Sequence, residues 1–309
     1  MFIKRIFVIL GLIWFGVGSQ LAAERPTVEQ TYANAKARKT HYLNVLDANP
    51  EDSDAHYNLA VLLEDAFQDY ETAKYHYLEA LSIDPKFSQA HYNFALLLKN
   101  RFQDYDRAIN HYKKAIESDP NYVEAYINQA LLLEDRYGKY ERARELLIQA
   151  TVCDSAHVTA YYNLALLSEN HFQDYESARR YYRKVLQINE KDADAHFRLA
   201  LLSDQKLEDF DAAKKHYIEA TRLHPKNAQA HFKLSQLLEE QFSDYESAKR
   251  HYEQALEIKP DYAPAHYNLA LLLATRFKQK QAGASHYQKA CQIDPRLKNK
   301  QADQFFGIE

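Results

Sequence analysis

The chain of 309 residues has 39 Lys and Arg against 43 Asp and Glu, which gives a formal net charge of −4 at pH 7. It therefore lacks the overall positive charge on which most nucleic-acid-binding proteins depend, and we expect no nucleic-acid partner. Hydrophobic residues make up 46% of the chain, while Gly and Pro number only 6 and 8. So few helix-breaking residues in a chain of ordinary hydrophobicity predict helices joined by short turns.

The first 23 residues have the layout of a secretory signal peptide. Lys4 and Arg5 precede an uncharged, mostly apolar run that ends at Gly18, and the small residues Ala22 and Ala23 follow. We therefore expect residues 1–23 to be removed and the protein to be secreted or periplasmic. The alternative is a membrane anchor formed by residues 6–23, although this run is short for a spanning helix, which needs about 20 apolar residues. Contact with a membrane is expected only in that second case.

An internal repeat organises the rest of the chain. The phrase AHYNLAVLL at 55–63 returns as AHYNLALLL at 265–273, and the offset of 210 residues equals six periods of 35. A fixed period of this length is typical of repeat arrays. We expect one domain with an N-terminal half repeat at 27–54, a short tail at 300–309, and seven units at 55–89, 90–124, 125–159, 160–194, 195–229, 230–264 and 265–299.

Each unit is predicted to form two helices joined by a tight turn. Apolar residues stand at positions 59, 60, 63 and 67 in its first half and at 73, 77, 80 and 81 in its second half, both with helical spacing. Pro85 marks the end of the second helix, and FQDY at 67–70 lies between the two. Positions one period apart are called a column here and are named by their residue in the unit 55–89.

Three columns, those of Ala60, Ala73 and Ala80, hold small residues in nearly every unit. Small side chains at regular positions allow two helix backbones to approach closely. One pair of helices cannot bury its apolar faces alone, so the units are expected to stack into an all-helical solenoid.

This pattern resembles the tetratricopeptide repeat, seven times over across 55–299. The residues that carry the resemblance in the first unit are His56, Leu59, Ala60, Leu63, Ala73, Tyr77 and Pro85. The resemblance implies a right-handed superhelical solenoid of helix-turn-helix units. The period of 35 exceeds the usual 34, and we expect the extra residue to lengthen the first helix, capped by a buried aromatic residue at Phe67. Pentatricopeptide repeats, which read single-stranded RNA, also have this period, but the small columns, the Asp-Pro ending and the acidic balance argue against them.

No pattern in the chain indicates catalysis, so we predict a protein that is not an enzyme, with no cofactor, no metal and no small-molecule substrate. The 14 His residues fall mainly into two columns, those of His56 and His76. A column spreads its members along the array, whereas a metal site needs several ligands at one point. We interpret these residues as partly buried and hydrogen-bonded, and expect them to destabilise the array near pH 5–6. Cys153 and Cys291 are interpreted as small buried hydrophobic residues with no disulfide between them.

The candidate binding residues lie in two columns of the first helix, which the resemblance places on the concave surface of the solenoid. An aromatic row would contact a ligand, and the Asn side chains beside it offer both donors and an acceptor to a peptide backbone. The predicted peptide-binding residues are Tyr57, Tyr92, Tyr162, Phe197, Phe232 and Tyr267 in the aromatic row, with Asn58, Asn93, Asn128, Asn163, Arg198, Lys233 and Asn268 beside them. The alternative is that Asn is simply common in this column of the family.

The partner is expected to be a protein that binds as an extended, neutral or basic segment. Acidic residues dominate the same helix face, with Lys99 as the exception, and they would attract such a segment; they are Glu64, Asp65, Glu134, Asp135, Glu169, Asp204, Glu239 and Glu240. A clamp for a C-terminal carboxylate at Asn128, Asn163 and Arg198 is a weaker hypothesis, because Glu124 and Asp194 stand one turn earlier and would repel a carboxylate.

Two further possibilities concern the role and the assembly of the chain. It could be a structural scaffold or assembly factor that acts through its convex and end surfaces, or the recruiting subunit of a separate enzyme. Terminal repeats usually need a polar cap, and the tail at 300–309 is short. We therefore expect a homo-oligomer through the C-terminal end, with Phe305 and Phe306 as contacts.

Overall fold

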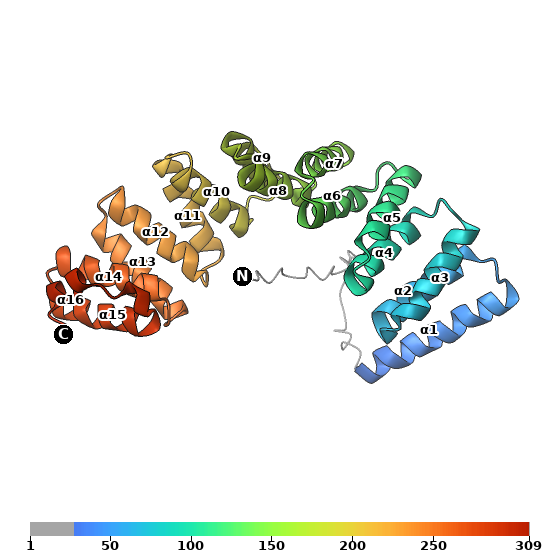
Figure 1. The fold of residues 1–309 in the computed structure, drawn as a ribbon, viewed down its shortest axis with the longest axis horizontal. Helices are drawn as coiled ribbons and strands as arrows, with labels where there is room; N and C mark the ends of the chain where they lie inside the picture. The colour runs from blue at the N-terminus through green and yellow to red at the C-terminus, as the bar shows by residue number, and fades with distance from the viewer. Residues whose placement is uncertain (1–27, 309) are drawn as a thin grey trace, which may run out of the picture. The chain divides into compact units, whose positions relative to one another are not determined.

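The computed structural model describes residues 28–308; residues 1–27 and 309 lie outside its description, so it does not test the predicted signal peptide. Within the described range the structure consists of helices and contains no strand, and consecutive helices are packed in pairs (Figure 1). The all-helical prediction is therefore confirmed. No helix of the described part is long and apolar enough to cross a membrane.

The chain divides into two compact units, residues 1–83 and 84–309. The described part of the first contains α1 (Val28–Ala48), α2 (Ser53–Leu62), the π-helical turn η1 (Leu63–Phe67) and α3 (Tyr70–Ile83). The single helix α1 corresponds to the half repeat that the sequence predicts, and it packs on α2. The side chain of Asp52 accepts a hydrogen bond from the backbone N–H of Ala55 and so caps the start of α2.

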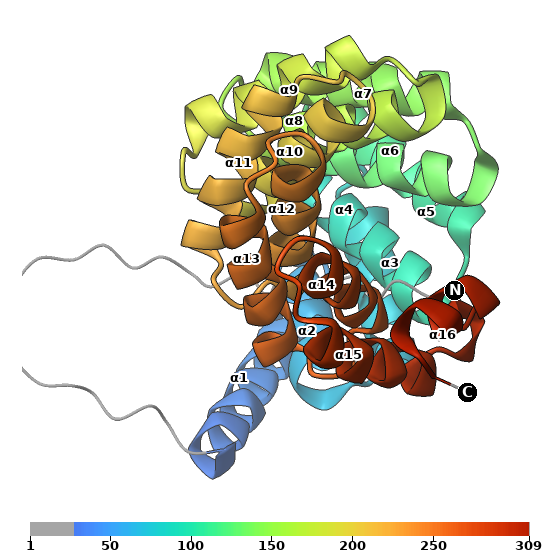
Figure 2. The same ribbon diagram turned by 90° about the vertical axis from the view of Figure 1, so that its left-hand side faces the viewer.

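The second compact unit repeats one pattern of paired helices. Its elements are α4 (Ser88–Leu97), η2 (Leu98–Phe102), α5 (Tyr105–Ser118), α6 (Val123–Tyr137), α7 (Tyr140–Cys153), α8 (Val158–Leu167), η3 (Ser168–Phe172), α9 (Tyr175–Ile188), α10 (Ala193–Gln205), α11 (Phe210–Leu223), α12 (Ala228–Glu240), α13 (Tyr245–Ile258), α14 (Ala263–Thr275), α15 (Lys280–Ile293), η4 (Pro295–Leu297) and α16 (Lys300–Phe306). In Figure 2 the first helix of each pair lies on the inner side of the coil of residues 84–309 and the second helix on its outer side.

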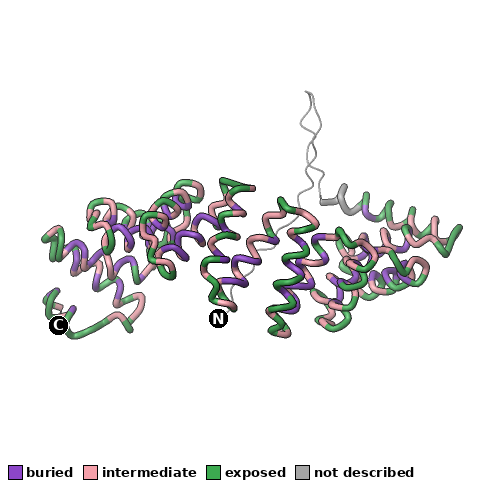
Figure 3. Tube along the Cα trace, turned by 90° about the horizontal axis from the view of Figure 1, so that it is seen from above, coloured by how far each residue is buried: buried purple, intermediate pink, exposed green. Residues whose placement is uncertain are grey.

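The core is distributed along the array. Buried positions recur on successive helices (Figure 3), and the buried residues form several clusters, each shared by neighbouring helices. The columns of Ala60, Ala73 and Ala80 are buried throughout, as a close approach of two helices requires. The ring of Tyr77 and its column fills the space that these small residues leave, and it is replaced once, by Leu147. Within residues 84–309 each helix pair contacts the next pair in sequence, so this part of the array is a solenoid.

The turn between the helices differs from the expected longer helix. In η1, η2 and η3 the extra residue widens the last turn to a π-helical one, and the backbone then reverses through a residue with a left-handed φ. The N–H of Asp69 reaches back to the carbonyl oxygen of Leu63 at 3.0 Å. Phe67 and its column are half-buried, so the prediction of a buried aromatic cap is wrong: the π turn carries the ring toward the edge of the helix pair.

The C-terminal tail also corrects the sequence analysis. Helix α16 covers the last pair, because Phe306 is buried and stacks on Tyr287 with 5.1 Å between ring centroids. Gly283 stands opposite that ring, and a Cβ there would lie 3.0 Å from Phe306 and 2.6 Å from the carbonyl oxygen of Ala270. Phe306 is thus part of the core and not an exposed contact for self-association, whereas Phe305 remains exposed.

The left-handed turn residue provides a reciprocal test of these units. Gln103 adopts φ 54° and Gly138 fills the same column with φ 59°. A side chain costs about 1 kcal/mol in this conformation, so Gln103→Gly should raise the melting temperature and Gly138→Ala should lower it. The nearest atoms to a Cβ at Gly138 would belong to the Tyr140 side chain, at 3.7 Å or more, so the loss would arise from the backbone. Thermal melting of the two variants, followed by circular dichroism, checks both predictions. Melting temperatures shifted in the same direction would contradict the left-handed conformation at these two positions.

Candidate peptide-binding face

The aromatic row of the first helices packs on the buried Tyr column of the second helices. Ring centroids lie 5.7–6.3 Å apart in six pairs: Tyr57–Tyr77, Tyr92–Tyr112, Tyr162–Tyr182, Phe197–Tyr217, Phe232–Tyr252 and Tyr267–Tyr287. The row is half-buried except at Phe232, which is 6% exposed and lies against Tyr262. Phe232, predicted to bind peptide, therefore serves the packing of the array. The other members keep part of each ring accessible.

The Asn column bonds to its own helix and to its neighbours. Asn58 and Asn163 each donate from Nδ2 to the carbonyl oxygen four residues earlier, at 2.7 and 2.9 Å. Asn128 donates to the carbonyl oxygen of Glu124 at 3.0 Å and to the hydroxyl of Tyr92 in the preceding unit at 3.1 Å. Within the described residues, the Oδ1 atoms of these three Asn accept no protein hydrogen bond, so each keeps an acceptor for a ligand.

Two of the remaining members of this column, Asn268 and Arg198, also contact the preceding unit. Asn268 donates to the hydroxyl of Tyr252 at 3.3 Å. Arg198 is half-buried and hydrogen-bonded to Tyr162. Burial lowers the pKa of Arg198, but the neighbouring Tyr162 raises it, and the net shift is upward. Lys233 bonds to Gln236 at 3.2 Å. Asn93 is half-buried on α4.

Several acids of the predicted rim are acceptors for buried Tyr hydroxyls. The hydroxyl of the second-helix Tyr donates to the acid 13 residues earlier in the pairs Tyr77–Glu64, Tyr182–Glu169, Tyr217–Asp204 and Tyr252–Glu239, at 3.0–3.3 Å. Burial raises the pKa of Asp204 and of Glu239. These acids are therefore structural, which the sequence analysis missed, although the constant spacing of 13 residues was visible as a signal.

Three units depart from this Tyr–acid pairing. The unit 125–159 has Leu147 in the Tyr column and needs no acceptor. In the last unit the position of the acid is Ala274, and Asp303 of α16 accepts from Tyr287 at 2.9 Å instead. In the unit 90–124 the acid is replaced by Lys99, and the buried hydroxyl of Tyr112 has no hydrogen-bond partner among the described residues.

The FQDY motif links neighbouring units through cation–π contacts. A basic residue of one second helix lies over the Phe of the next unit, as with Arg144 over Phe172 at 4.2 Å and Lys214 over Phe242 at 4.2 Å. A second basic residue, from the following unit, lies over the Tyr of the motif, as with Arg276 over Tyr245 at 4.7 Å. The recurrence of the motif therefore reflects contacts between units along the turn edge.

The two His columns form five identical pairs, which confirms that these residues are hydrogen-bonded and partly buried. The Nδ1 atoms lie 2.8–3.0 Å apart in His56–His76, His91–His111, His196–His216, His231–His251 and His266–His286. The Nε2 of the first His lies 3.1 Å from the carbonyl oxygen six residues earlier in each pair. A carbonyl can only accept, so this Nε2 donates, its Nδ1 accepts, and the second His donates from Nδ1.

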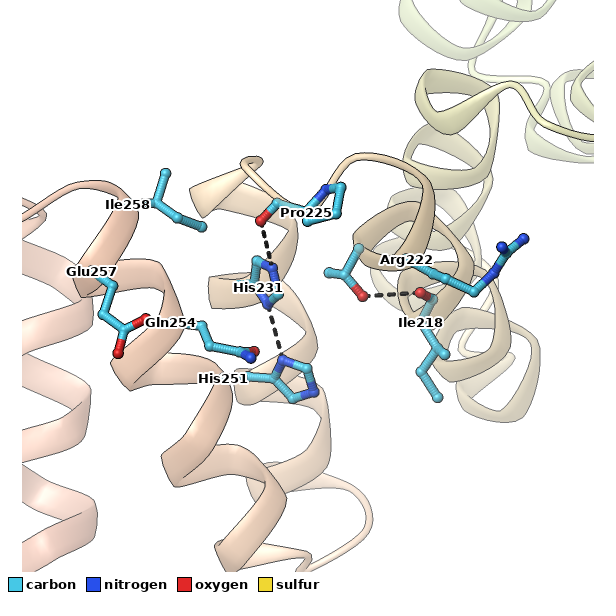
Figure 4. A pocket seen from close by; sticks show the side chains of 9 residues that line it. Ile218, Arg222, Pro225, His231, His251, Gln254, Glu257 and Ile258 are labelled. Carbon is cyan, nitrogen blue, oxygen red and sulfur yellow. Dashed lines mark hydrogen bonds between the residues drawn. The ribbon is translucent and has the colours of Figure 1, made fainter.

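One of these pairs borders a pocket of about 440 Å³ between α11 and α13 (Figure 4). His231 and His251 lie beside Gln254, while Ile218 and Ile258 contribute apolar walls. Burial, and next the charge of His231, lower the pKa of His251 to about 4. Burial likewise lowers the pKa of His76, His111 and His216 to about 4.

The described residues contain no group of three or more side chains arranged to hold a metal ion. Cys153 and Cys291 are free thiols, and both are half-buried, so their interpretation as buried residues is wrong. The thiol of Cys153 donates to the carbonyl oxygen of Pro120 at 3.3 Å.

The face formed by the first helices offers half-buried rings, amide oxygens and charged groups, which are the groups that recognise a polar ligand.

Comparison with known proteins agrees with this architecture. A sequence model described as tetratricopeptide repeat matches residues 41–75, 76–110 and 111–145, and a second one matches 134–193 and 199–241. A third, described as TPR repeat, matches residues 243–275. The chain belongs to the tetratricopeptide repeat family. No curated protein sequence matches it.

Several solved structures share the fold. Pseudomonas aeruginosa pilF is 23% identical with a TM-score of 0.55, covering 67% of this chain and 92% of that one. A tetratricopeptide repeat protein from Parabacteroides merdae is 17% identical with a TM-score of 0.53, covering 83% of this chain and 98% of that one. YrrB, described as a TPR protein with an unusual peptide-binding site, is 21% identical with a TM-score of 0.52, covering 61% and 95%. At these identities the likeness shows the fold.

The His pairs predict a loss of stability in acid. The folded protein keeps His76, His111, His216 and His251 neutral down to about pH 4, whereas unfolded His takes up a proton near pH 6.5. Between these values the unfolded state binds more protons, so stability is full above about pH 7 and falls as the pH drops toward 4. The raised pKa values of Asp204 and Glu239 act in the opposite direction, in the more acidic range in which carboxyls titrate.

We expect a melting temperature lower by roughly 5 °C or more at pH 5 than at pH 7.5. Replacing one pair by the Tyr pair that occupies the same columns in the unit 160–194, His196→Tyr with His216→Tyr, should reduce this difference. Equal melting temperatures at the two pH values would contradict the prediction.

The Tyr–acid pairing predicts opposite effects of one substitution in two units. Tyr182→Phe removes a hydrogen bond to Glu169 and should destabilise the array by about 1–2 kcal/mol. Tyr112→Phe removes a buried hydroxyl without an acceptor, so it should be neutral or stabilising. Parallel chemical or thermal unfolding of the two variants tests this, and an equal loss in both would show that Tyr112 is satisfied.

Proposed function

We propose that the chain is a non-enzymatic protein-interaction module that binds an extended peptide segment along the inner face of its first helices. The observation that carries the proposal is that the half-buried side chains of Asn128 and Asn163, in the second compact unit, keep their Oδ1 atoms available. Asn58 of the first compact unit has the same amide arrangement. An extended peptide presents an N–H at regular intervals and needs acceptors for it. Solenoids of stacked repeats use their concave surfaces for such ligands.

The hydrogen bonds within the column support a sharper form of this proposal. Asn128 uses its Nδ2 for Glu124 and Tyr92, so it would receive a peptide N–H through Oδ1 and donate nothing. Asn58 and Asn163 each bond one carbonyl oxygen through Nδ2, so their second N–H can still bond to a peptide carbonyl. The hydrogen bonds also fix the amide orientation before a ligand arrives, which lowers the entropy cost of binding.

The charge of the face favours a neutral or basic segment for most of its length. Glu134 and Glu240 add to the acids that accept hydrogen bonds from Tyr hydroxyls on this face. The negative charge of this face would increase the association rate and the specificity of a basic segment more than its affinity. A peptide-binding site is also named for YrrB, whose fold this chain shares.

A scaffold that acts through its convex and end surfaces is the second candidate, including recruitment of a separate enzyme. It is favoured by exposed apolar residues on outer helices, with Val152 71% exposed on α7 and Ile148 beside it. The covered C-terminal end weakens the part of this alternative that uses Phe306. A homo-oligomer would instead have to use other surfaces, such as that of Phe305.

The cellular location is a separate proposal, supported by the sequence of residues 1–23. We propose that the protein is exported and that the segment is removed after Ala22 or Ala23. N-terminal sequencing of the protein from its native source checks this. A chain that retains Met1 or Phe2 would favour the membrane anchor.

The peptide-binding proposal predicts a loss of partners on truncation of the Asn side chains. Asn128→Ala combined with Asn163→Ala should reduce partner recovery in an affinity pull-down with mass spectrometry by about tenfold or more, since each lost bond costs about 1 kcal/mol. Both residues are half-buried and polar, so the fold should survive, with a small loss of stability from the Tyr92 contact.

The matched control changes the outer face instead, with Lys113→Ala and Arg183→Ala on α5 and α9. These second-helix variants should recover the wild-type set of partners. If the Asn variant recovers that set and the outer-face variant loses it, the scaffold interpretation replaces the peptide-binding one.

A further inference from the structure

The unit 90–124 contains a buried hydrogen-bond donor that no described residue satisfies. The side chain of Tyr112 is 0% exposed, and its hydroxyl has no hydrogen-bond partner in the described part of the protein. Leaving such a group unpaired costs about 1–3 kcal/mol, so an unpaired hydroxyl indicates that something else completes it. Burial raises the pKa of Tyr112 well above its usual range, so the hydroxyl is a donor at every working pH.

The other units show which group belongs at this position. Tyr77, Tyr182, Tyr217 and Tyr252 each donate to a carboxylate oxygen 3.0–3.3 Å away, and all four rings are as buried as Tyr112. The fold thus repeats one geometry in which a carboxylate meets the end of the Tyr ring. In the unit 90–124 the side chain at the position of the acid is Lys99, which starts from the same π-helical turn as Glu64 and Glu169 do in theirs.

The last unit shows that the carboxylate can come from another segment. Its position for the acid is Ala274, and the acceptor for Tyr287 is Asp303, which belongs to the helix that follows the unit, at 2.9 Å. A carboxylate brought from outside a unit therefore reaches the same hydroxyl. The unit 90–124 has no such following segment, since α6 begins the next regular pair.

We propose that the Tyr112 hydroxyl, together with Lys99, forms a subsite for one carboxylate of the bound peptide. This inference rests on the proposed peptide-binding function and names one feature of its ligand. The ligand carboxylate accepts a hydrogen bond from Tyr112 as Glu169 accepts one from Tyr182. Lys99 stands where the other units have an acid, and its positive charge attracts the carboxylate of the ligand.

The surroundings of the subsite fit an extended ligand. Tyr92 lies 5.9 Å from Tyr112 between ring centroids and accepts from Asn128 at 3.1 Å, so the subsite joins the aromatic row and the Asn column. A segment that is neutral or basic elsewhere can place one acid here, because Lys99 is the one basic residue among the acids of this helix position. The subsite is distinct from a clamp at Asn128, Asn163 and Arg198, since its donor comes from the second helix.

The carboxylate can be an Asp or Glu side chain or a free C-terminus. Both are tested by selecting binders from two libraries of random 12-residue peptides, one with an amidated and one with a free C-terminus, on the full mature chain. We expect enrichment of Asp or Glu at one fixed position in the amidated library if the source is a side chain. If the source is a C-terminus, enrichment should be confined to the free library.

Three variants then separate the subsite from the face. Tyr112→Phe and Lys99→Glu should each weaken the selected peptide about tenfold or more, while a peptide with Gln for its acid should bind the wild type equally weakly. Tyr112→Phe should melt no lower than the wild type, because it removes the unpaired hydroxyl. Asn128→Ala should weaken peptides with and without an acid alike.

The outcomes distinguish the two levels of the proposal. Peptides that bind the wild type without any acidic preference, and equally well to Tyr112→Phe, would overturn the subsite and leave the peptide-binding face standing. Failure of the wild type to enrich any peptide from either library would overturn the face and the subsite together.

Discussion

A buried tyrosine hydroxyl at the centre of six of the seven helix pairs is the constraint on which the rest of the structure depends. Small residues in three columns bring two helices together closely enough for the ring of the Tyr77 column to fill the space between them. The ring contributes apolar burial, but its hydroxyl must find an acceptor inside the pair. An acid on the first helix provides that acceptor in four units, and α16 provides it in the last. The acid column is therefore a consequence of core packing.

This constraint also shapes the face that we propose to bind peptide. The aromatic row rests on the same Tyr rings, and the Asn column bonds to hydroxyls of the preceding unit at Tyr92 and Tyr252. Residues that could contact a ligand are consequently held by the packing beneath them. A face supported in this way is pre-organised, and a ligand that binds it loses little energy to rearrangement of the protein.

The contacts between units are short in range and repeat at fixed positions. The His pairs connect the first helix to the second and to the preceding loop, while cation–π contacts join the second helix of one unit to the turn of the next. Stability in such an array is approximately a sum over units and their nearest neighbours. A unit that lacks one contact, as the unit 90–124 lacks the Tyr–acid bond, can thus be tolerated because its neighbours remain intact.

The sequence by itself determined the period, the helix pairs, the small columns and the family, because each follows from the spacing of residue types along the chain. It also placed the His residues in columns with a packing role. Only the tertiary structure decided what those columns do, since the partner of a side chain lies 13 or 20 residues away or in another unit. Spacing alone could not show that Glu169 is held by Tyr182, that Phe232 is buried, or that Phe306 covers the last pair. The unpaired hydroxyl of Tyr112 is visible only there, because hydrogen bonding depends on distances that the chain order does not fix.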